Sequence, residues 1–190
     1  ASGRLVTMSE PPKYEAPYEP RYPIMAYALA AARHMHEFGT TREQLAEVAV
    51  AARKWAQLNP EAFERGDLTI EDVLKARMVC DPLTTRDCCL VTDGAGAIVM
   101  VAADRAKDMP KPPVYFLGGA AASWYRAISA APDLVTTSAS DSGRRAYAMA
   151  GLAPQDVDVL ELYDAFTINT ILFLEDLGFC KKGEGGPFVS

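Results

Sequence analysis

Residues 159–190, VLELYDAFTINTILFLEDLGFCKKGEGGPFVS, decide the fold that we expect for this chain. The apolar run that opens this stretch predicts a strand, and the helix predicted over residues 165–177 is apolar nearly all round. Such a helix is buried within a larger body. The ionisable side chains of Glu161, Tyr163 and Asp164 lie between strand and helix. Sites in open α/β sheets form beyond the carboxyl ends of strands, so we expect chemistry at this corner.

Residues 1–21, which are rich in proline and tyrosine, are predicted to form an extended loop, and the residues from 23 to the Asn59-Pro60 pair are predicted to be helical. Apolar residues recur at helical spacing over residues 23–38, and Gly39 is placed to cap the end of that helix. A second helix is expected to follow at once, with Thr40 and Glu43 as a capping box, and to end at an Asn-Pro pair. Because the connection is so short, the two helices are expected to pack as an antiparallel pair.

Strands alternate with helices in the rest of the chain. A short helix capped by Thr69 is expected over residues 70–76. Strands are then expected over residues 88–101 and 114–119, followed by a helix over residues 141–150 and a strand over residues 159–162. Within the first of these strands, residues 97–101 form an apolar run typical of a fully buried strand. This order of elements predicts an α/β fold.

The composition excludes several classes of function. Hydrophobic residues make up 49% of the 190 residues and charged residues 23%, which is typical of a globular protein. The net charge is −6 and no basic cluster is interleaved with aromatic residues, so nucleic acid and anionic membrane surfaces are not expected as partners. No apolar run is long enough to span a bilayer. The spacing of the four cysteines matches no zinc site, so no metal is expected. We expect their thiols to be buried and reduced, in a cytoplasmic protein; they are Cys80, Cys88, Cys89 and Cys180.

Four stretches of the chain carry a resemblance to a known family. Residues 150–167, AGLAPQDVDVLELYDAFT, and residues 174–189, LEDLGFCKKGEGGPFV, resemble the thiolase superfamily, and more narrowly its lipid-transfer-protein or sterol-carrier-protein type. Residues 92–101, TDGAGAIVMV, resemble the Asp-Gly-Ala strand that closes the first half of these proteins. Residues 27–63 resemble their inserted helical loop domain. The resemblance covers nearly the whole chain in the right order.

The resemblance implies a thiolase-like fold, in which two similar halves sandwich buried central helices between two mixed sheets. The chain, which begins without an initiating methionine, then looks like the middle half of a subunit and is expected to be incomplete. Residues 1–87 correspond to the helical loop domain and residues 88–108 to the last strand and connector of the first half. Residues 109–190 correspond to the first part of the second half.

The resemblance also implies an enzyme that acts on coenzyme A thioesters. Thiolase-like acyltransferases, such as the acetyl-CoA acetyltransferases of lipid metabolism, make or break a carbon–carbon bond. Their oxyanion-side motif, Asn-Glu-Ala-Phe or His-Asp-Cys-Phe, matches residues 163–166, which read YDAF here. Tyr163 is the departure, and related retro-aldolases that shorten steroid side chains carry a tyrosine at this place. Tyr163 and Asp164 are therefore the candidate catalytic residues, because a phenol can donate a hydrogen bond or a proton to an oxyanion.

Other parts of the family's catalytic machinery are absent from this sequence. The nucleophilic cysteine, the Gly-His-Pro histidine and the Cys-Gly cysteine have no match, so a non-catalytic protein that binds acyl-CoA or scaffolds a partner is the alternative. His36 is the nearer match to a loop-domain histidine that contacts the CoA thioester in the family. The resemblance further implies a homodimer, and bacterial relatives pair with a small subunit of the OB-fold type.

Several of these residues also have simpler interpretations. Asp164 would cap the following helix, Tyr163 would pack its ring, and Glu161 would be a satisfied buried carboxylate. The lysines at positions 181–182 would lie on the solvated surface. Residues 183–186, GEGG, lack the features of a phosphate loop and would form a flexible loop that leads to another part of the site.

Overall fold

The computed structural model describes residues 13–190, and the chain is organised around one helix, α6 (Thr167–Asp176). The other helices of this part of the chain are α1 (Ile24–Phe38), α2 (Arg42–Leu58), α3 (Ile70–Lys75), α4 (Ala103–Ala106), α5 (Ala139–Ala150) and α7 (Gly185–Phe188). Two short strands, β1 (Met78–Cys80) and β2 (Leu83–Thr84), form an antiparallel pair. Single 3₁₀ turns lie at Ala16–Tyr18, Ile128–Ala130 and Pro154–Asp156.

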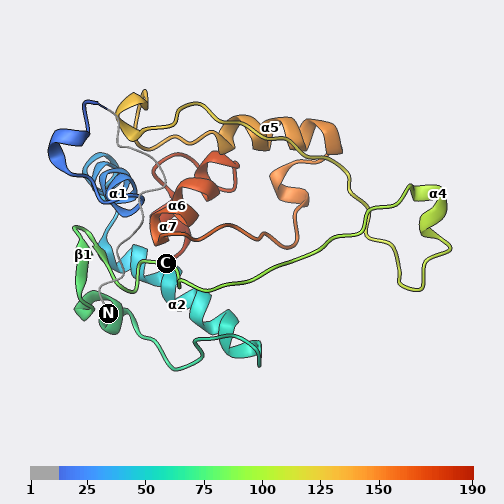
Figure 1. Ribbon diagram of the computed structural model, residues 1–190, viewed down its shortest axis with the longest axis horizontal. Coiled ribbons are helices and arrows are strands. Elements are labelled where there is room, and N and C mark those ends of the chain that lie inside the picture. The colour runs from blue at the N-terminus through green and yellow to red at the C-terminus, as the bar shows by residue number, and fades with distance from the viewer. Residues whose placement is uncertain (1–12) are drawn as a thin grey trace.

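Helix α6 is buried because its side chains are apolar on nearly every side, as the sequence predicts. Ile168 and Ile171 are completely buried. Helices α1, α2, α5 and α7 all pack against α6, which lies between them in Figure 1. The helix begins two residues later than expected, because residues 165–166 are held in an extended conformation by another segment. Burial of this helix by four others makes it the centre of the described core.

The first two helices lie within about one residue of their predicted bounds. Gly39 ends α1 with φ at 73°, a left-handed conformation that glycine adopts without strain. Thr41 and Gln44, one residue later than predicted, form the capping box of α2, with the Gln44 N–H donating to Thr41 Oγ1 at 3.3 Å. The hydroxyl of Thr40 is engaged elsewhere, since it lies 2.8 Å from Nδ1 of His34. The tertiary contact therefore decides which threonine caps the helix.

The predicted antiparallel pairing of α1 and α2 is wrong. In Figure 1, α1 is seen nearly end-on whereas α2 runs across the view, and each of them packs on α6. The buried side chains of α1, such as Ala28 and Ala31, join Leu45 and Val48 of α2 in one core cluster with α6. Both apolar stripes are thus satisfied by a third helix, which a short connecting turn does not reveal.

Helix α3 confirms the predicted short helix and its cap. The Asp72 N–H donates to Thr69 Oγ1 at 3.1 Å, and the Thr69 N–H donates to the Asp72 carboxylate at 3.0 Å. Val73 of α3 packs in a small separate cluster with Ala46 and Val50 of α2. The chain then turns through β1 and β2 toward the N-terminal end of α6.

The strands predicted over residues 88–101, 114–119 and 159–162 form no sheet within the described chain, and only Cys88 and Cys89, at the start of the first one, pair with another segment. Residues 88–120 leave the helical body, run out to α4 and return (Figure 1). Val91, Ile98 and Val114 are 99%, 91% and 98% exposed, so the prediction of buried strands is wrong for this chain. A strand needs a neighbouring backbone to pair with, and beyond Cys89 no described segment makes backbone hydrogen bonds to these residues. The described part is therefore helix-rich, and the expected boundaries after residues 87 and 108 stay predictions.

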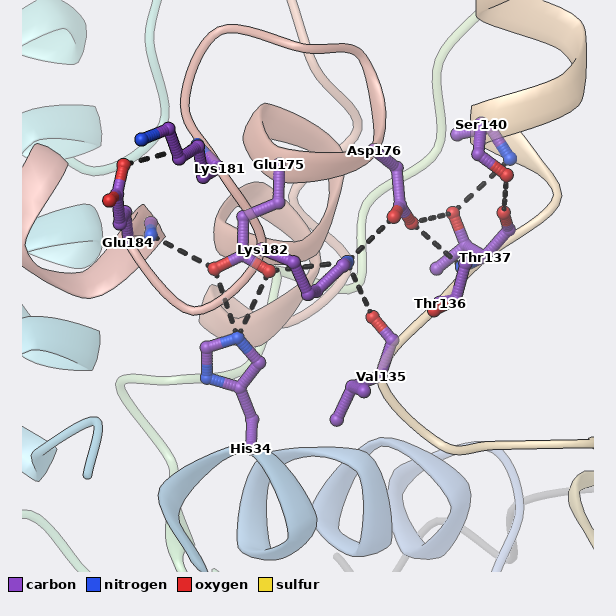
Figure 2. Close-up of polar contacts among 12 residues, drawn as sticks. His34, Val135, Thr136, Thr137, Ser140, Glu175, Asp176, Lys181, Lys182 and Glu184 are labelled. Carbon is purple, nitrogen blue, oxygen red and sulfur yellow. Dashed lines mark hydrogen bonds and ion pairs between the residues drawn. The ribbon is translucent and has the colours of Figure 1, made fainter. Parts of the chain in front are cut away.

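A buried polar cluster holds the C-terminal end of α6 (Figure 2). The Glu175 carboxylate accepts a hydrogen bond from His34 Nε2 at 3.0 Å and from the Gly185 N–H at 2.9 Å, and it lies 3.2 Å from Lys182 Nζ. Burial raises the pKa of Glu175, but the hydrogen bonds from His34 and Gly185 and the nearby positive charge outweigh it, so the pKa is lowered. The cluster ties α1 and the residues before α7 to α6.

Lys182 extends this cluster to a fourth segment. Its Nζ lies 2.6 Å from the Asp176 carboxylate and donates to the Val135 carbonyl at 2.8 Å (Figure 2). The prediction that the two lysines lie on the solvated surface is therefore wrong for Lys182. The prediction of a flexible loop over residues 183–186 is wrong as well. Gly185 is buried and lies so close to α6 that a side-chain carbon at this position would be 3.0 Å from the Ile171 carbonyl oxygen.

Candidate functional site

The corner predicted to carry chemistry lies where the extended segment 157–163 meets α6. Tyr163 is 69% exposed and Asp164 is exposed beside it, whereas the next residues of the chain are buried. Asp164 does not cap α6, because the N-cap position is Phe166 and no side chain bonds to the first turn there. Glu161 is exposed, so its prediction as a buried carboxylate is wrong. The two candidate side chains form no hydrogen bond with the rest of the described chain.

The backbone just after this corner is fixed by the segment that follows β2. The Cys89 N–H donates to the Ala165 carbonyl at 3.0 Å, and Cys88 pairs with Phe166 across an isolated antiparallel bridge. The Phe166 ring is buried, and its centroid lies 4.4 Å from that of Tyr27 in α1. The corner is thus an exposed pair of side chains on a backbone that is anchored from the next residue onward.

Asp87 lies at the centre of this anchor and was not predicted from the sequence. Its carboxylate accepts hydrogen bonds from the Thr84 N–H at 2.8 Å, the Thr84 hydroxyl at 2.7 Å and the Thr167 hydroxyl at 2.8 Å. The Thr167 N–H, at the start of α6, donates to the Asp87 carbonyl at 3.0 Å. Asp87 is 5% exposed, and it makes no ion pair with any described residue.

A cleft of about 400 Å³ separates the corner from α2 and the residues that follow it. Asp164 and Thr167 line its wall on the α6 side, and Arg86 and Cys89 line it from the segment after β2. The opposite wall is made of small and apolar side chains, among them Ala49, Ala52, Ala56, Phe63 and Leu68. Tyr163 is not among the lining residues, although its neighbour Asp164 is.

Two arginines give the cleft a positive rim, and they differ in how they are used. The Arg53 guanidinium donates to the Gly66 carbonyl at 2.7 Å and lies 3.6 Å from Glu64, so protein groups already hold it. Arg86 is exposed, and its guanidinium pairs with no acidic residue of residues 13–190. A free guanidinium at the rim of a cleft is suited to bind a phosphate or carboxylate of a ligand.

A second, apolar groove of about 470 Å³ meets the same corner from the other side. Asp164 lines both the cleft and this groove. Most other lining residues are apolar, including Trp55 of α2, which is 75% exposed, and Leu160, Leu162, Leu174, Phe179 and Val189. The C-terminal half of α2 thus faces this groove through Trp55. The corner stands between a polar cleft and an apolar groove.

Two of the cysteines are poor nucleophiles in their environment. Burial, together with the negative charge of Asp87, raises the pKa of the Cys88 thiol to about 11. Burial and the neighbouring Glu175 raise the pKa of Cys180 to about 11. A thiol attacks as its thiolate, which is scarce at neutral pH when the pKa is this high. All four cysteines are free, but Cys89 is exposed and none is fully buried, so the expected burial is wrong.

The two histidines of α1 have different surroundings. His36, the predicted contact to CoA, is exposed near the end of the helix, and α1 contributes no residue to the cleft or the groove. Its role stays a prediction. His34 is completely buried in the Glu175 cluster. No three histidine, cysteine or acidic side chains of the described residues are grouped so as to hold a metal ion.

Sequence reasoning missed Asp87 and the His34–Glu175 pair for different reasons. Asp87 ends a Thr-x-x-Asp unit, residues 84–87, with the same spacing as the capping unit at residues 69–72. That repeated spacing is a signal that could have shown a structured turn. His34 and Glu175 are 141 positions apart, and no local pattern links them. No helix in the described range has the length and apolarity to cross a bilayer.

Comparisons with known proteins agree with the resemblance seen in the sequence. Residues 120–190 match the family model described as thiolase C-terminal domain-like. Acetyl-CoA acetyltransferase of Methanothermobacter thermautotrophicus is 43% identical over 175 residues, which cover 92% of this chain and 45% of that protein. A steroid side-chain-cleaving aldolase of Thermomonospora curvata is 37% identical over 185 residues, which cover 92% of this chain and 46% of that protein.

The fold is similar to that of a solved structure. The Ltp2-ChsH2(DUF35) aldolase superposes on the whole of this chain with a TM-score of 0.88 and 34% sequence identity, and the match covers 52% of that chain. The chain spans about half the length of the relatives it matches. The expected thiolase-like fold is therefore confirmed, whereas the expected mixed sheets and the incompleteness of the chain stay predictions. The chain is a homologue of thiolase-superfamily enzymes, among them acetyltransferases and a steroid side-chain aldolase.

Proposed function

We propose that the protein acts on acyl-CoA thioesters by making or breaking a carbon–carbon bond, with the corner at Tyr163 and Asp164 forming one wall of its site. The observation that carries this proposal is an exposed, unpaired phenol on an anchored backbone, beside a cleft with a positive rim. The similarity to an acetyl-CoA acetyltransferase and to a side-chain-cleaving aldolase supports the same class of reaction.

The cleft and the groove suggest how such a substrate would lie. Arg86 at the rim of the cleft suits a phosphate of coenzyme A. The apolar groove beyond Asp164 suits a hydrophobic acyl group, whose burial contributes roughly 25 cal/mol per Å² of apolar surface. The thioester would then lie at the corner between the two. His36 is a weaker candidate for a contact to the CoA tail, since it lies outside both hollows.

Tyr163 favours the retro-aldol form of the reaction. In a β-hydroxyacyl-CoA the hydroxyl gives its proton to a base and the bond between the α and β carbons breaks. The β carbon leaves as a ketone or aldehyde, and the electron pair of the broken bond turns the thioester into an enolate that is then protonated at the α carbon. A phenol placed at the corner can donate a hydrogen bond to the enolate oxygen or deliver that proton. This route needs no cysteine nucleophile, which fits the protonated Cys88 and Cys180 thiols. Thiolase-type acyl transfer would need a nucleophile from outside these residues.

Subunit association is part of the proposal. The similar solved structure is a complex whose name includes a DUF35 component, and we infer that a small subunit of that kind, of the OB-fold type, pairs with this protein. A homodimer is proposed as well. The exposed apolar segments at residues 90–101 and 114–117 are suited to be covered by further protein, because contiguous exposed apolar surface of this kind marks interaction sites. We place the protein in the cytoplasm and propose no metal for the reaction.

Replacing Tyr163 tests its proposed role. In the full-length protein, Tyr163→Phe removes only the hydroxyl and is expected to lower the kcat for cleavage of a β-hydroxyacyl-CoA about 100-fold or more, the size of a lost proton donor. Tyr18→Phe is the matched control, because Tyr18 is 79% exposed but lies in a different part of the chain. The control is expected to keep its turnover within about twofold of the parent.

The competing reactions are separated by the substrates supplied. Acetoacetyl-CoA with free CoA reports thiolysis, and a β-hydroxyacyl-CoA alone reports aldol cleavage. Robust thiolysis that survives Tyr163→Phe would overturn the retro-aldol form. Tight CoA binding without turnover on either substrate would instead favour a non-catalytic, acyl-CoA-binding protein.

A further inference from the structure

The anchor at the N-terminal end of α6 contains a buried carboxylate whose charge is not neutralised by a neighbouring cation. Asp87 is 5% exposed and meets only hydrogen-bond donors, from Thr84 and from Thr167. Burying a carboxylate is costly unless hydrogen bonds satisfy it, and removing its partners is costly in turn. The three donors therefore fix the carboxylate, and the carboxylate fixes the two threonines with respect to each other.

The two threonines belong to parts of the chain that are far apart in sequence. Thr84 ends β2, and Thr167 begins α6, four residues after Tyr163. The residues after Asp87 then run antiparallel to the residues after Asp164, through the Cys88–Phe166 bridge and the Cys89–Ala165 hydrogen bond. The place of the Tyr163 backbone is set by these contacts, because residues on its other side, 158–162, make no backbone hydrogen bond in the described chain.

A second copy of the same local unit shows what is special about Asp87. Residues 69–72 also form a Thr-x-x-Asp turn, with the Asp72 carboxylate 3.0 Å from the Thr69 N–H and 2.6 Å from its hydroxyl. That carboxylate is exposed and contacts no other element. The unit at residues 84–87 has nearly the same geometry, but it is buried and its second oxygen reaches α6. The extra contact to Thr167 is not needed to make the turn.

We propose that Asp87 is a positioning residue for the proposed reaction, which acts by tying Thr84 to Thr167 and so holds Tyr163 and Asp164 at a fixed place beside the cleft. The inference rests on the proposed role of this corner. Asp87 touches no reacting atom in this account, and its effect passes through hydrogen bonds that fix the backbone. A misplacement of about 1 Å at a reacting group can cost roughly 100-fold in rate, so a loosened anchor has a measurable effect.

Two substitutions at Asp87 separate hydrogen bonding from charge. Asp87→Ala removes all three hydrogen bonds and is expected to lower kcat in the full-length enzyme about 30- to 100-fold, with KM changed by less than about threefold. Asp87→Asn keeps an oxygen for the two Thr84 donors and places an amide against Thr167, whose hydroxyl can accept as well as donate. It is therefore expected to restore turnover to within about fivefold of the parent. Asp72→Ala is the control that removes the matched turn and is expected to leave turnover unchanged.

A readout that does not depend on activity reports the position of Tyr163. With 3-fluorotyrosine at position 163, the ¹⁹F resonance in Asp87→Ala is expected to broaden or split, whereas in Asp87→Asn it keeps the parent shift. If Asp87→Ala does not fold, Thr167→Val and Thr167→Ser take its place. Turnover is expected to fall in Thr167→Val, which lacks the hydroxyl, and to be retained in Thr167→Ser, which keeps it. Parent turnover and an unmoved resonance in the variants without the hydrogen bond would overturn the proposal. A moved resonance with parent turnover would keep the anchor but refute the catalytic role of the corner. A loss of turnover in Asp87→Asn equal to that in Asp87→Ala would show that the charge of the carboxylate, and not its hydrogen bonding, is what matters.

Discussion

The two ends of α6 are both held by carboxylates, but in different ways. At the C-terminal end, Glu175 and Asp176 meet the cationic Lys182 and the imidazole of His34, and the contacts join four segments of the chain (Figure 2). At the N-terminal end, Asp87 meets only hydroxyl and N–H donors. The first arrangement is a closed cluster beneath the surface, whereas the second borders a cleft.

This difference indicates two tasks for one helix. The C-terminal cluster offsets the cost of burying charge by pairing it, and its consequence is that α1, α6 and the segment before α7 are locked together. The N-terminal anchor stabilises a backbone corner whose side chains stay free to meet a ligand. Stability should therefore respond most to changes at the C-terminal end, and turnover most to changes at the N-terminal end.

Removing Glu175 is expected to have the largest effect on stability. Glu175→Ala leaves His34 buried without its carboxylate and removes the acceptor of the Gly185 N–H. Breaking a buried charged pair costs about 3–5 kcal/mol of unfolding free energy, which urea denaturation of the full-length protein measures. Glu37→Ala is the matched control, since Glu37 is an exposed carboxylate 2.8 Å from Arg33 and should contribute only about 0.3–0.5 kcal/mol. Equal effects of the two substitutions would break the contrast between the ends of α6.

Lowering the pH is expected to have a smaller effect on the free energy of unfolding. The pKa of Glu175 is lowered in the folded protein from its ordinary value of 4.5, so its carboxylate stabilises the fold above that pH. This contribution is lost as the pH falls through the lowered pKa. The difference in unfolding free energy between the parent and Glu175→Gln should therefore be largest above pH 4.5 and shrink below it. A difference that grows toward acid would contradict the sign of this shift.

Replacing the Cys88 thiol, which lies next to the Asp87 anchor, is expected to have the smallest effect, a minor change in turnover. Cys88→Ser keeps a donor for the Thr84 carbonyl, which Cys88 Sγ approaches at 3.2 Å. Because the pKa of this thiol is raised to about 11, it is protonated at neutral pH and contributes no nucleophile. Turnover of the full-length enzyme is expected to stay within about threefold of the parent. A loss of 100-fold would show that the sulfur takes part in the chemistry and that the N-terminal end is more than an anchor.

Local signals in the sequence predicted the helices well. Gly39, at positive φ, ends α1 where the sequence predicts a glycine cap, and Thr69 caps α3 as predicted. The apolar composition of α6 predicted its burial. These features depend on residues within a few positions of one another, so a reading of neighbouring residues is sufficient to find them.

Contacts between distant segments were not predictable in the same way. Thr41 replaces Thr40 as the cap of α2 because His34 engages Thr40, and Lys182 is drawn from the surface by Glu175. At the candidate site, the corner itself was predicted from its position between strand and helix. Asp87, which holds the corner, lies 80 positions from its partner Thr167, and only a fold that brings these residues together reveals the contact.

The separation of His34 from Glu175 by 141 positions also has a consequence for synthesis on the ribosome. Chains grow at about 5–20 residues per second, so roughly 7–30 s pass between the appearance of the imidazole and that of its carboxylate partner. Throughout that interval α6 is absent, and the apolar faces of α1 and α2 lack the helix on which both of them pack. We expect the nascent chain to be a client for chaperones that shield apolar surface until α6 emerges.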